Sequence, residues 1–117
     1  MVKVIISGGR GFYNYMLLKL KCDKILKEIE GEIQIVSGCA KGADALGERY
    51  AKARQLIVKR FEADWDKNGK FAGHIRNAEM AKYSDCLIAF WDGRSPGTKS
   101  MISQAEKRGL KIRVIKY

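Results

Sequence analysis

The chain has 117 residues, with 23 Lys and Arg against 13 Asp and Glu, which gives a formal net charge of +10. Hydrophobic residues make up 46% and charged residues 31%, a balance that excludes a disordered tail, and the length is right for one domain spanning 1–117. No uncharged apolar run approaches the roughly 20 residues that cross a bilayer, and 1–6 is followed at once by glycines rather than continuing as a signal peptide. We therefore expect a cytoplasmic protein with no membrane partner.

Cysteine and histidine are too scarce for several familiar kinds of site. Cys22, Cys39 and Cys86 are odd in number and widely spaced, and His74 is the single histidine. A disulfide framework and a structural zinc site are disfavoured, and a catalytic triad would depend on His74 alone. We expect no metal and no resident cofactor.

The apolar pattern alternates between strand and helix along the chain. Five short β-branched or apolar runs predict strands, at 2–7, 33–37, 57–61, 86–90 and 112–115. Helical spacing lies between them, at 18–29, 43–51, 74–83 and 101–105. This alternation predicts an α/β fold, a Rossmann-like three-layer αβα sandwich whose five-stranded, mostly parallel sheet has the order 3-2-1-4-5. The longest irregular piece, 63–73, is expected to be a functional loop.

Ligands of such sheets bind beyond the carboxyl ends of the strands, where the strand order reverses. The loop at 7–12 contains Gly8, Gly9 and Gly11, whose exposed N–H groups could bind an anion beside Arg10 and Phe12. Neither the dinucleotide fingerprint nor the P-loop motif is present. The alternative is an ordinary glycine-rich turn.

The next loop, 37–44, also places glycines between a strand and a helix. Gly38 is a further candidate binding residue, and Asp44 falls in the first helical turn. Asp44 could interact with the helix dipole as a cap, or it could bond a ribose hydroxyl or polarise a water. Cys39 would need His74 as its base to act as a nucleophile, so we expect it to be a small loop residue.

Two later segments add aromatic and polar candidates. In 63–80, Trp65 or Phe71 could stack on a base, while Arg76 and Asn77 could meet phosphate or ribose at a helix start. The alternative is that Trp65 pins this segment to the core. In 91–99, Gly97 and Thr98 form a second possible phosphate site, with the Thr98 hydroxyl as donor.

Four motifs in this order are similar to those of a known family. They are Ser7-Gly8-Gly9-Arg10-Gly11-Phe12, Ser37-Gly38-x-Ala40-x-Gly42-Ala43-Asp44, Ala63-Asp64-Trp65-x-x-x-Gly69-Lys70-x-Ala72-Gly73-x-x-Arg76-Asn77-x-x-Met80, and Gly97-Thr98-x-x-Met101. Together they resemble the YspA (cpYpsA)-related branch of the SLOG superfamily over essentially the whole chain. The resemblance implies binding of a nucleotide or nucleotide-derived ligand, such as an ADP-ribose-type molecule. Asp64 joins the candidate binding residues.

The resemblance leaves two other functions open. Kinship with the lonely-guy phosphoribohydrolases implies an N-glycosidase, in which Arg76 and Asp44 would be catalytic. Met101, however, stands where those enzymes have a glutamate, and Asp64 or Glu79 could also take the carboxylate role. Kinship with the DNA-processing protein DprA, together with the charge of +10, implies nucleic-acid binding. Superfamily relatives often pair, and Phe12, Tyr13 and Tyr15 near the site would suit a homo-oligomer interface.

Overall fold

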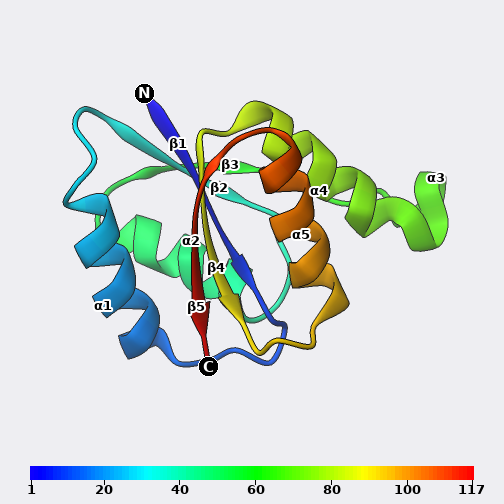
Figure 1. Cartoon of the computed structure of the whole chain (residues 1–117), viewed down its shortest axis with the longest axis horizontal. Coiled ribbons are helices and arrows are strands. Elements are labelled where there is room, and N and C mark those ends of the chain that lie inside the picture. Colours follow the sequence, from blue (N-terminus) through cyan, green and yellow to red (C-terminus); the bar gives the residue numbers. More distant parts are fainter.

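The computed structural model describes all residues, 1–117, as five strands, five α-helices and one short 3-10 turn (Figure 1). In chain order they are β1 (Val2–Gly8), α1 (Tyr15–Leu26), β2 (Ile33–Ser37), α2 (Ala43–Ala53), β3 (Ile57–Arg60), α3 (Trp65–Asn68), η1 (Gly69–Phe71), α4 (Ala72–Tyr83), β4 (Cys86–Trp91), α5 (Pro96–Lys107) and β5 (Lys111–Lys116).

The sheet has the order β3-β2-β1-β4-β5, and all four strand pairs are parallel. The predicted order and the α/β class are confirmed. In the register of the central strands, Ile5 lies beside Val36 of β2 and Leu87 of β4. The strand order reverses at β1, so the loops after β1, β2 and β4 meet at one edge of the sheet.

Successive residues of each central strand point to opposite faces, which divides the core in two. On one face, Val4 and Ile6 pack with Leu18 of α1 and Tyr50 of α2. On the other face, Ile5 packs with Met80 of α4 and Met101 of α5. The result is the expected three-layer sandwich, with α1 and α2 on one side of the sheet and α4 and α5 on the other (Figure 1).

Polar side chains cap the starts of α1 and α5. Asn14 caps α1 by accepting a hydrogen bond from the Leu17 amide at 3.0 Å. Ser95 caps α5 in the same way, and Pro96 follows at the first helical position, where a missing N–H costs nothing. None of the helices combines the length and apolar character needed to cross a bilayer.

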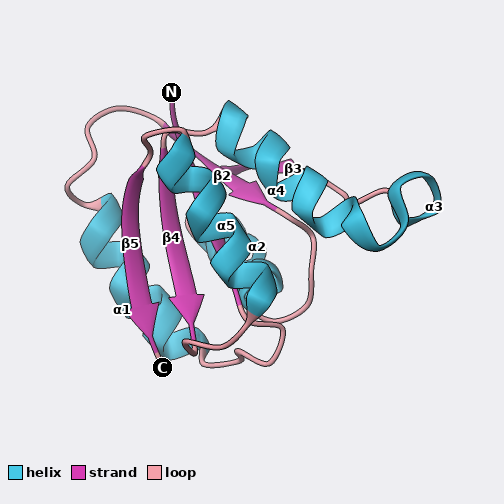
Figure 2. Cartoon of the chain, turned by 45° about the vertical axis from the view of Figure 1, so that its right-hand side comes forward, coloured by secondary structure: helices cyan, strands magenta, loops and turns pink.

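The segment at 63–73 is helical, and the expectation of an irregular loop is wrong. Asp64 caps α3 by accepting from the Lys67 amide at 3.0 Å, and Gly69, at φ +57°, ends α3 after a single turn. Helix α4 then begins at Ala72, two residues earlier than predicted. A four-residue helix is too short to show a hydrophobic period, which explains why the pattern did not reveal it. Figures 1 and 2 both show α3 extending outward beyond the sheet.

Candidate functional site

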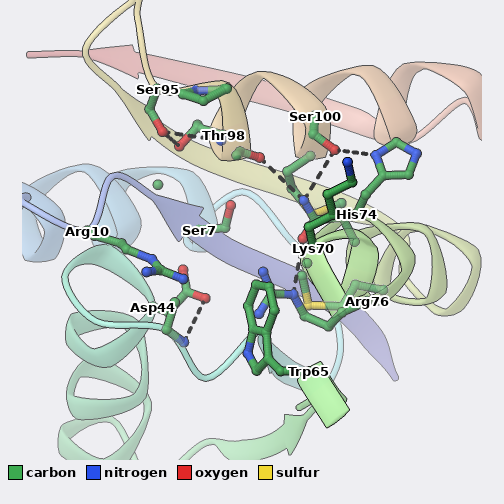
Figure 3. A pocket seen from close by; sticks show the side chains of 18 residues that line it. Ser7, Arg10, Asp44, Trp65, Lys70, His74, Arg76, Ser95, Thr98 and Ser100 are labelled. Atoms are coloured by element: carbon green, nitrogen blue, oxygen red, sulfur yellow. Dashed lines mark hydrogen bonds between the residues drawn. The ribbon is translucent and has the colours of Figure 1, made fainter. Parts of the chain in front are cut away.

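A cavity of about 490 Å³ opens at the carboxyl ends of β1 and β4, at the point where the strand order reverses. Its walls come from the loops after β1 and β2, from the starts of α2 and α5, and from α3 and α4 (Figure 3). The lining residues are Ser7, Gly8, Arg10, Ala40, Asp44, Trp65, Lys70, Gly73, His74, Arg76, Asn77, Met80, Ser95, Pro96, Gly97, Thr98, Ser100 and Met101. This volume is in the range of small-molecule sites.

Glycines allow the loop after β1 and the loop after β2 to pack closely against each other. The Ala43 amide donates to the Gly9 carbonyl at 3.2 Å. Gly42 has φ +74°, and a Cβ there would overlap the carbonyls of Gly9 and Arg10. A Cβ on Gly8 would run into the Phe90 carbonyl and lie 2.9 Å from the Ala43 Cβ. These glycines therefore allow the close packing of backbone that forms the cavity floor.

The structure places part of the predicted first-loop site away from the cavity. Gly9 does not line it, and a Cβ on Gly9 would meet the Tyr117 hydroxyl rather than a ligand. Phe12 is 2% exposed and stacks on Phe90 with a centroid separation of 4.9 Å. Gly11 is exposed and lies outside the cavity lining.

Phe12 is thus a core residue, and its expected exposure as an interface aromatic is wrong. Tyr13 is exposed and Tyr15 is half-buried. The expectation of a homo-oligomer stays a prediction.

Asp44 is a buried carboxyl in the cavity wall, only 4% exposed. Its Oδ2 accepts a hydrogen bond from the Ala40 amide at 3.3 Å, so the carboxylate stabilises the loop before α2. Burial raises the pKa of Asp44 from its usual 3.8 to about 6, against the opposing effects of the Ala40 amide and the Arg76 charge. Asp44 can therefore change protonation state near neutral pH.

Arg76 reaches across from α4 to the loop after β2. Its Nη1 donates to the Gly38 carbonyl at 2.6 Å, and its Nε donates to Asn77 Oδ1 at 3.2 Å. A Cβ on Gly38 would lie 2.8 Å from Asp44 Oδ2 and 3.1 Å from Arg76 Nε. Gly38 is therefore needed because any larger residue would push Asp44 and Arg76 away from the loop.

Asn77 is buried and joins α4 to α5. Its Nδ2 donates to the Gly97 carbonyl at 3.3 Å and to Ser100 Oγ at 3.4 Å. The same side chain accepts from Arg76, as described above. Asn77 thus positions both the arginine and the start of α5.

Trp65 lies beside Arg76, and its side chain is 52% exposed. A Cβ on Gly73 would be 3.5 Å from Trp65 Cη2 and 3.7 Å from Arg76 Nη2, so the two side chains share one wall of the cavity (Figure 3). The alternative in which Trp65 pins the segment to the core is wrong. Asp64 lies outside the cavity lining and caps α3.

The start of α5 forms the opposite wall. Thr98 is 3% exposed, and its Oγ1 donates to Ser95 Oγ at 3.2 Å, so this hydroxyl proton is used within the cap. Gly97 has open space where a Cβ would be. Thr98 and Gly97 both line the cavity, and the role of the Thr98 hydroxyl toward a phosphate stays a prediction.

The sequence interpretation missed a polar chain on the facing surfaces of α4 and α5. His74 Nδ1 lies 2.9 Å from Ser100 Oγ, and His74 Nε2 lies 3.0 Å from Gln104 Nε2. His74 is exposed, and it also lines the cavity together with Ser100 and Lys70. Helical spacing could have revealed them, since His74 precedes Asn77 by three residues and Ser100 follows Gly97 by three.

A second cavity of about 380 Å³ adjoins the first, and Arg10, Ala40, Trp65 and Arg76 line both. Its other lining residues are Gly38, Cys39, Lys41, Arg60, Glu62 and Ala63. Burial raises the pKa of the Cys39 thiol above its ordinary value, which disfavours the thiolate. The structure therefore gives no support to Cys39 as a nucleophile.

Comparison with known proteins gives three results. The model of the YspA, cpYpsA-related SLOG family matches residues 2–68. The Gene 61 protein of Mycobacterium phage D29 is 31% identical over 119 residues, which covers 96% of this chain and 94% of that protein. The X-ray structure of DNA processing protein A (DprA) from Streptococcus pneumoniae superposes with a TM-score of 0.78 at 20% identity. That match covers 100% of this chain and 51% of the DprA chain, so this chain spans about half of that protein.

Proposed function

The chain belongs to the YspA, cpYpsA-related SLOG family, and we propose that it binds a nucleotide or nucleotide-derived ligand in the cavity between α2, α4 and α5, in order to sense or sequester it. The phosphate lies against Arg10, Arg76 and the open start of α5 at Gly97. The base stacks on Trp65, and a ribose hydroxyl donates to Asp44. We expect this binding in the cytoplasm.

The position of Arg76 carries this proposal. Two of its N–H groups are held by Gly38 and Asn77, while its Nη2 would lie 3.7 Å from a Cβ on Gly73, which lines the cavity with Arg76 and Trp65. A guanidinium fixed in this way binds phosphate without first losing rotamer freedom. An indole beside it offers a face for a base.

Calorimetry with AMP tests the proposal. We expect saturable binding by the parent protein and roughly five-fold or more weaker binding by Trp65→Ala, because base stacking is worth about 1–3 kcal/mol. Tyr13→Ala is the matched control, because Tyr13 is an exposed aromatic residue outside the cavity lining. If AMP, ADP and ADP-ribose all fail to bind the folded parent, the proposal is wrong.

A second candidate function is N-glycosidase activity, which the buried, cavity-lining Asp44 favours. In that reaction the bond between ribose C1′ and the base breaks, the hydroxyl of a water molecule adds to C1′, and the remaining proton of that water passes to the leaving base. A carboxylate stabilises the positive charge that develops on the ribose. Met101 lines the cavity and supplies no carboxylate. We therefore favour binding without turnover. Release of free adenine from AMP, detected by chromatography and reduced in Asp44→Asn, would establish the enzyme instead.

Nucleic-acid binding is a third candidate, favoured by the net charge of +10 and by the fold shared with DprA. A DNA-binding surface releases counterions, so its affinity falls steeply as salt rises. We expect a short DNA duplex to bind only weakly at physiological salt and without competing with AMP. If the duplex binds tightly at physiological salt and AMP displaces it, this third function is favoured.

A further inference from the structure

The strand β5 forms one edge of the sheet and pairs with β4 alone, as Figure 2 shows. The Lys111 amide donates to the Asp85 carbonyl at 3.2 Å, so the backbone groups of the odd-numbered residues of β5 are directed toward β4. Successive backbone groups of a strand point to alternate sides. The groups that face outward are therefore those of Ile112, Val114 and Lys116. They form a row of N–H and C=O groups that no other strand pairs with.

The side chains of β5 form two different faces. Ile115 packs on the core beneath α1, and Lys111 and Arg113 share that face of the strand. Ile112 packs on the core beneath α5, and Val114 shares that opposite face and is 41% exposed. Lys111 and Arg113 are both exposed, and neither is in an ion pair. One face of the edge is thus cationic and the other is apolar.

Further positive charge surrounds this edge. The segment 107–116 contains no Asp or Glu, and its cations are Lys107, Arg108, Lys111, Arg113 and Lys116. A second copy of β5 would bring these cations against their own kind, which is how lysines on an edge strand prevent a sheet from pairing with itself. The same charges attract a partner of opposite sign and so select for it.

The opposite edge of the sheet is different. The strand there, β3, has four residues, whereas β5 has six. Arg60 of β3 lies 3.3 Å from a Glu48 carboxylate oxygen and 3.6 Å from one of Glu62, so its charge is already compensated. The longer edge, with uncompensated charge, is β5.

We propose that β5 is a docking edge for an acidic, extended segment of another protein, which adds to the sheet as a sixth strand. The backbone of that segment pairs with the outward groups of Ile112, Val114 and Lys116. Carboxylates at alternate positions of the segment lie beside Lys111 and Arg113, and the apolar side chains between them lie beside Val114. A nucleic acid would meet the same cations, but it has no peptide backbone to pair with the edge.

Fluorescence anisotropy with a labelled peptide of alternating Glu and Val residues, equal in length to β5, tests the proposal. We expect saturable binding by the parent protein. The matched control is the same peptide with an N-methyl group at every peptide bond, which keeps all charges and side chains but removes the backbone donors. We expect it to bind at least ten-fold more weakly, because a strand is held by its backbone hydrogen bonds.

Variants of the edge give a second test with the unmodified peptide. Arg113→Glu should weaken binding at least ten-fold. Lys52→Glu, on the exposed surface of α2, changes the net charge equally and should stay within two-fold of the parent. Val114→Pro deletes one outward N–H and no hydrogen bond to β4, a position at which edge strands accept proline. It should also weaken binding at least ten-fold, with a parental circular dichroism spectrum to show that the variant is folded.

Several results would overturn the proposal. The parent protein could fail to bind the peptide, or it could bind the N-methylated peptide as tightly. Equal weakening by Arg113→Glu and Lys52→Glu would show that net charge alone attracts the peptide. If the two peptides bind equally and a DNA duplex displaces both, the edge is a nucleic-acid surface instead. AMP binding in the cavity is measured separately, so the proposed function does not depend on any of these results.

Discussion

Two hydrogen bonds hold the Arg76 guanidinium, one from Nη1 to the Gly38 carbonyl and one from Nε to Asn77 Oδ1. A lysine ammonium lacks the planar set of N–H donors and cannot make both hydrogen bonds. We expect Arg76→Lys to weaken AMP binding roughly ten-fold even though the charge is kept, and Arg76→Ala to weaken it further, because each hydrogen bond to a charged group is worth about 1.5–3 kcal/mol. Titration calorimetry measures both. Arg108→Lys, at the exposed end of α5, is the control and should match the parent. Equal AMP affinity of Arg76→Lys and the parent would show that the planar guanidinium is not required for AMP binding.

Asp44 makes the free energy of unfolding depend on pH. Its pKa is about 6 in the folded protein against 3.8 ordinarily, so the folded state binds the proton more tightly than the unfolded state does. Asp44 therefore favours folding below about pH 4, and this contribution is lost as the pH rises through 6.

We expect Asp44→Asn to be more stable than the parent at pH 8, by roughly 1–3 kcal/mol, and the difference to disappear near pH 4. Urea unfolding of both proteins at pH 4, 6 and 8 measures this. The variant should also bind AMP more weakly, because an amide accepts a ribose hydroxyl less well than a carboxylate. Parallel pH profiles for the two proteins would contradict the assignment.

At the scale of elements, the start of α5 depends on one side chain. Ser95 Oγ accepts from the Thr98 amide at 3.4 Å and from the Thr98 hydroxyl at 3.2 Å. We expect Ser95→Ala to lower the free energy of unfolding by about 1 kcal/mol, as loss of an N-cap does. Chemical denaturation measures the loss, and Ser103→Ala, on the exposed part of the same helix, is the control. If both variants lose equally, the cap contributes nothing.

The junction of the first two loops depends on glycine, whereas the α5 start does not. Gly42 combines φ +74° with backbone neighbours that a Cβ would overlap, while a Cβ on Gly97 has open space. We expect Gly42→Ala to cost more than about 1 kcal/mol of stability and Gly97→Ala to cost almost none.

Gly97→Ala should nevertheless weaken AMP binding, because the added methyl occupies the cavity wall where the phosphate approaches. Thermal unfolding and calorimetry on the two variants separate these effects. If Gly97→Ala binds AMP with the affinity of the parent, the phosphate does not approach the start of α5.

At the scale of the whole molecule, a ligand that binds only the folded chain stabilises it. At a concentration 100 times its dissociation constant, AMP should add about 2.7 kcal/mol, which for a chain of this size raises the melting temperature by roughly 10 °C. Differential scanning fluorimetry measures the shift, and Arg76→Ala at the same AMP concentration should lose most of it. If AMP raises the melting temperature of Arg76→Ala as much as that of the parent, AMP binds outside the cavity that Arg76 lines.

The sequence by itself determined the layers and the strand order. The β-branched runs and the helical spacing between them are local signals, and parallel strands joined by right-handed crossovers have few possible arrangements. The sheet order and the ends of β1, β2 and β4 could therefore be predicted. The location of a cavity at the carboxyl ends of those strands follows from the same rule.

Only the tertiary structure decided which loop residues face the cavity. Gly9 and Phe12 have the same local signals as Gly8 and Arg10, but contacts with Tyr117 and Phe90 turn them into the core. His74 and Ser100 are 26 residues apart and meet because α4 packs on α5. Trp65 lines both cavities from α3, a single turn too short to leave a period in the sequence. Such contacts are set by packing between distant segments, which a local pattern does not encode.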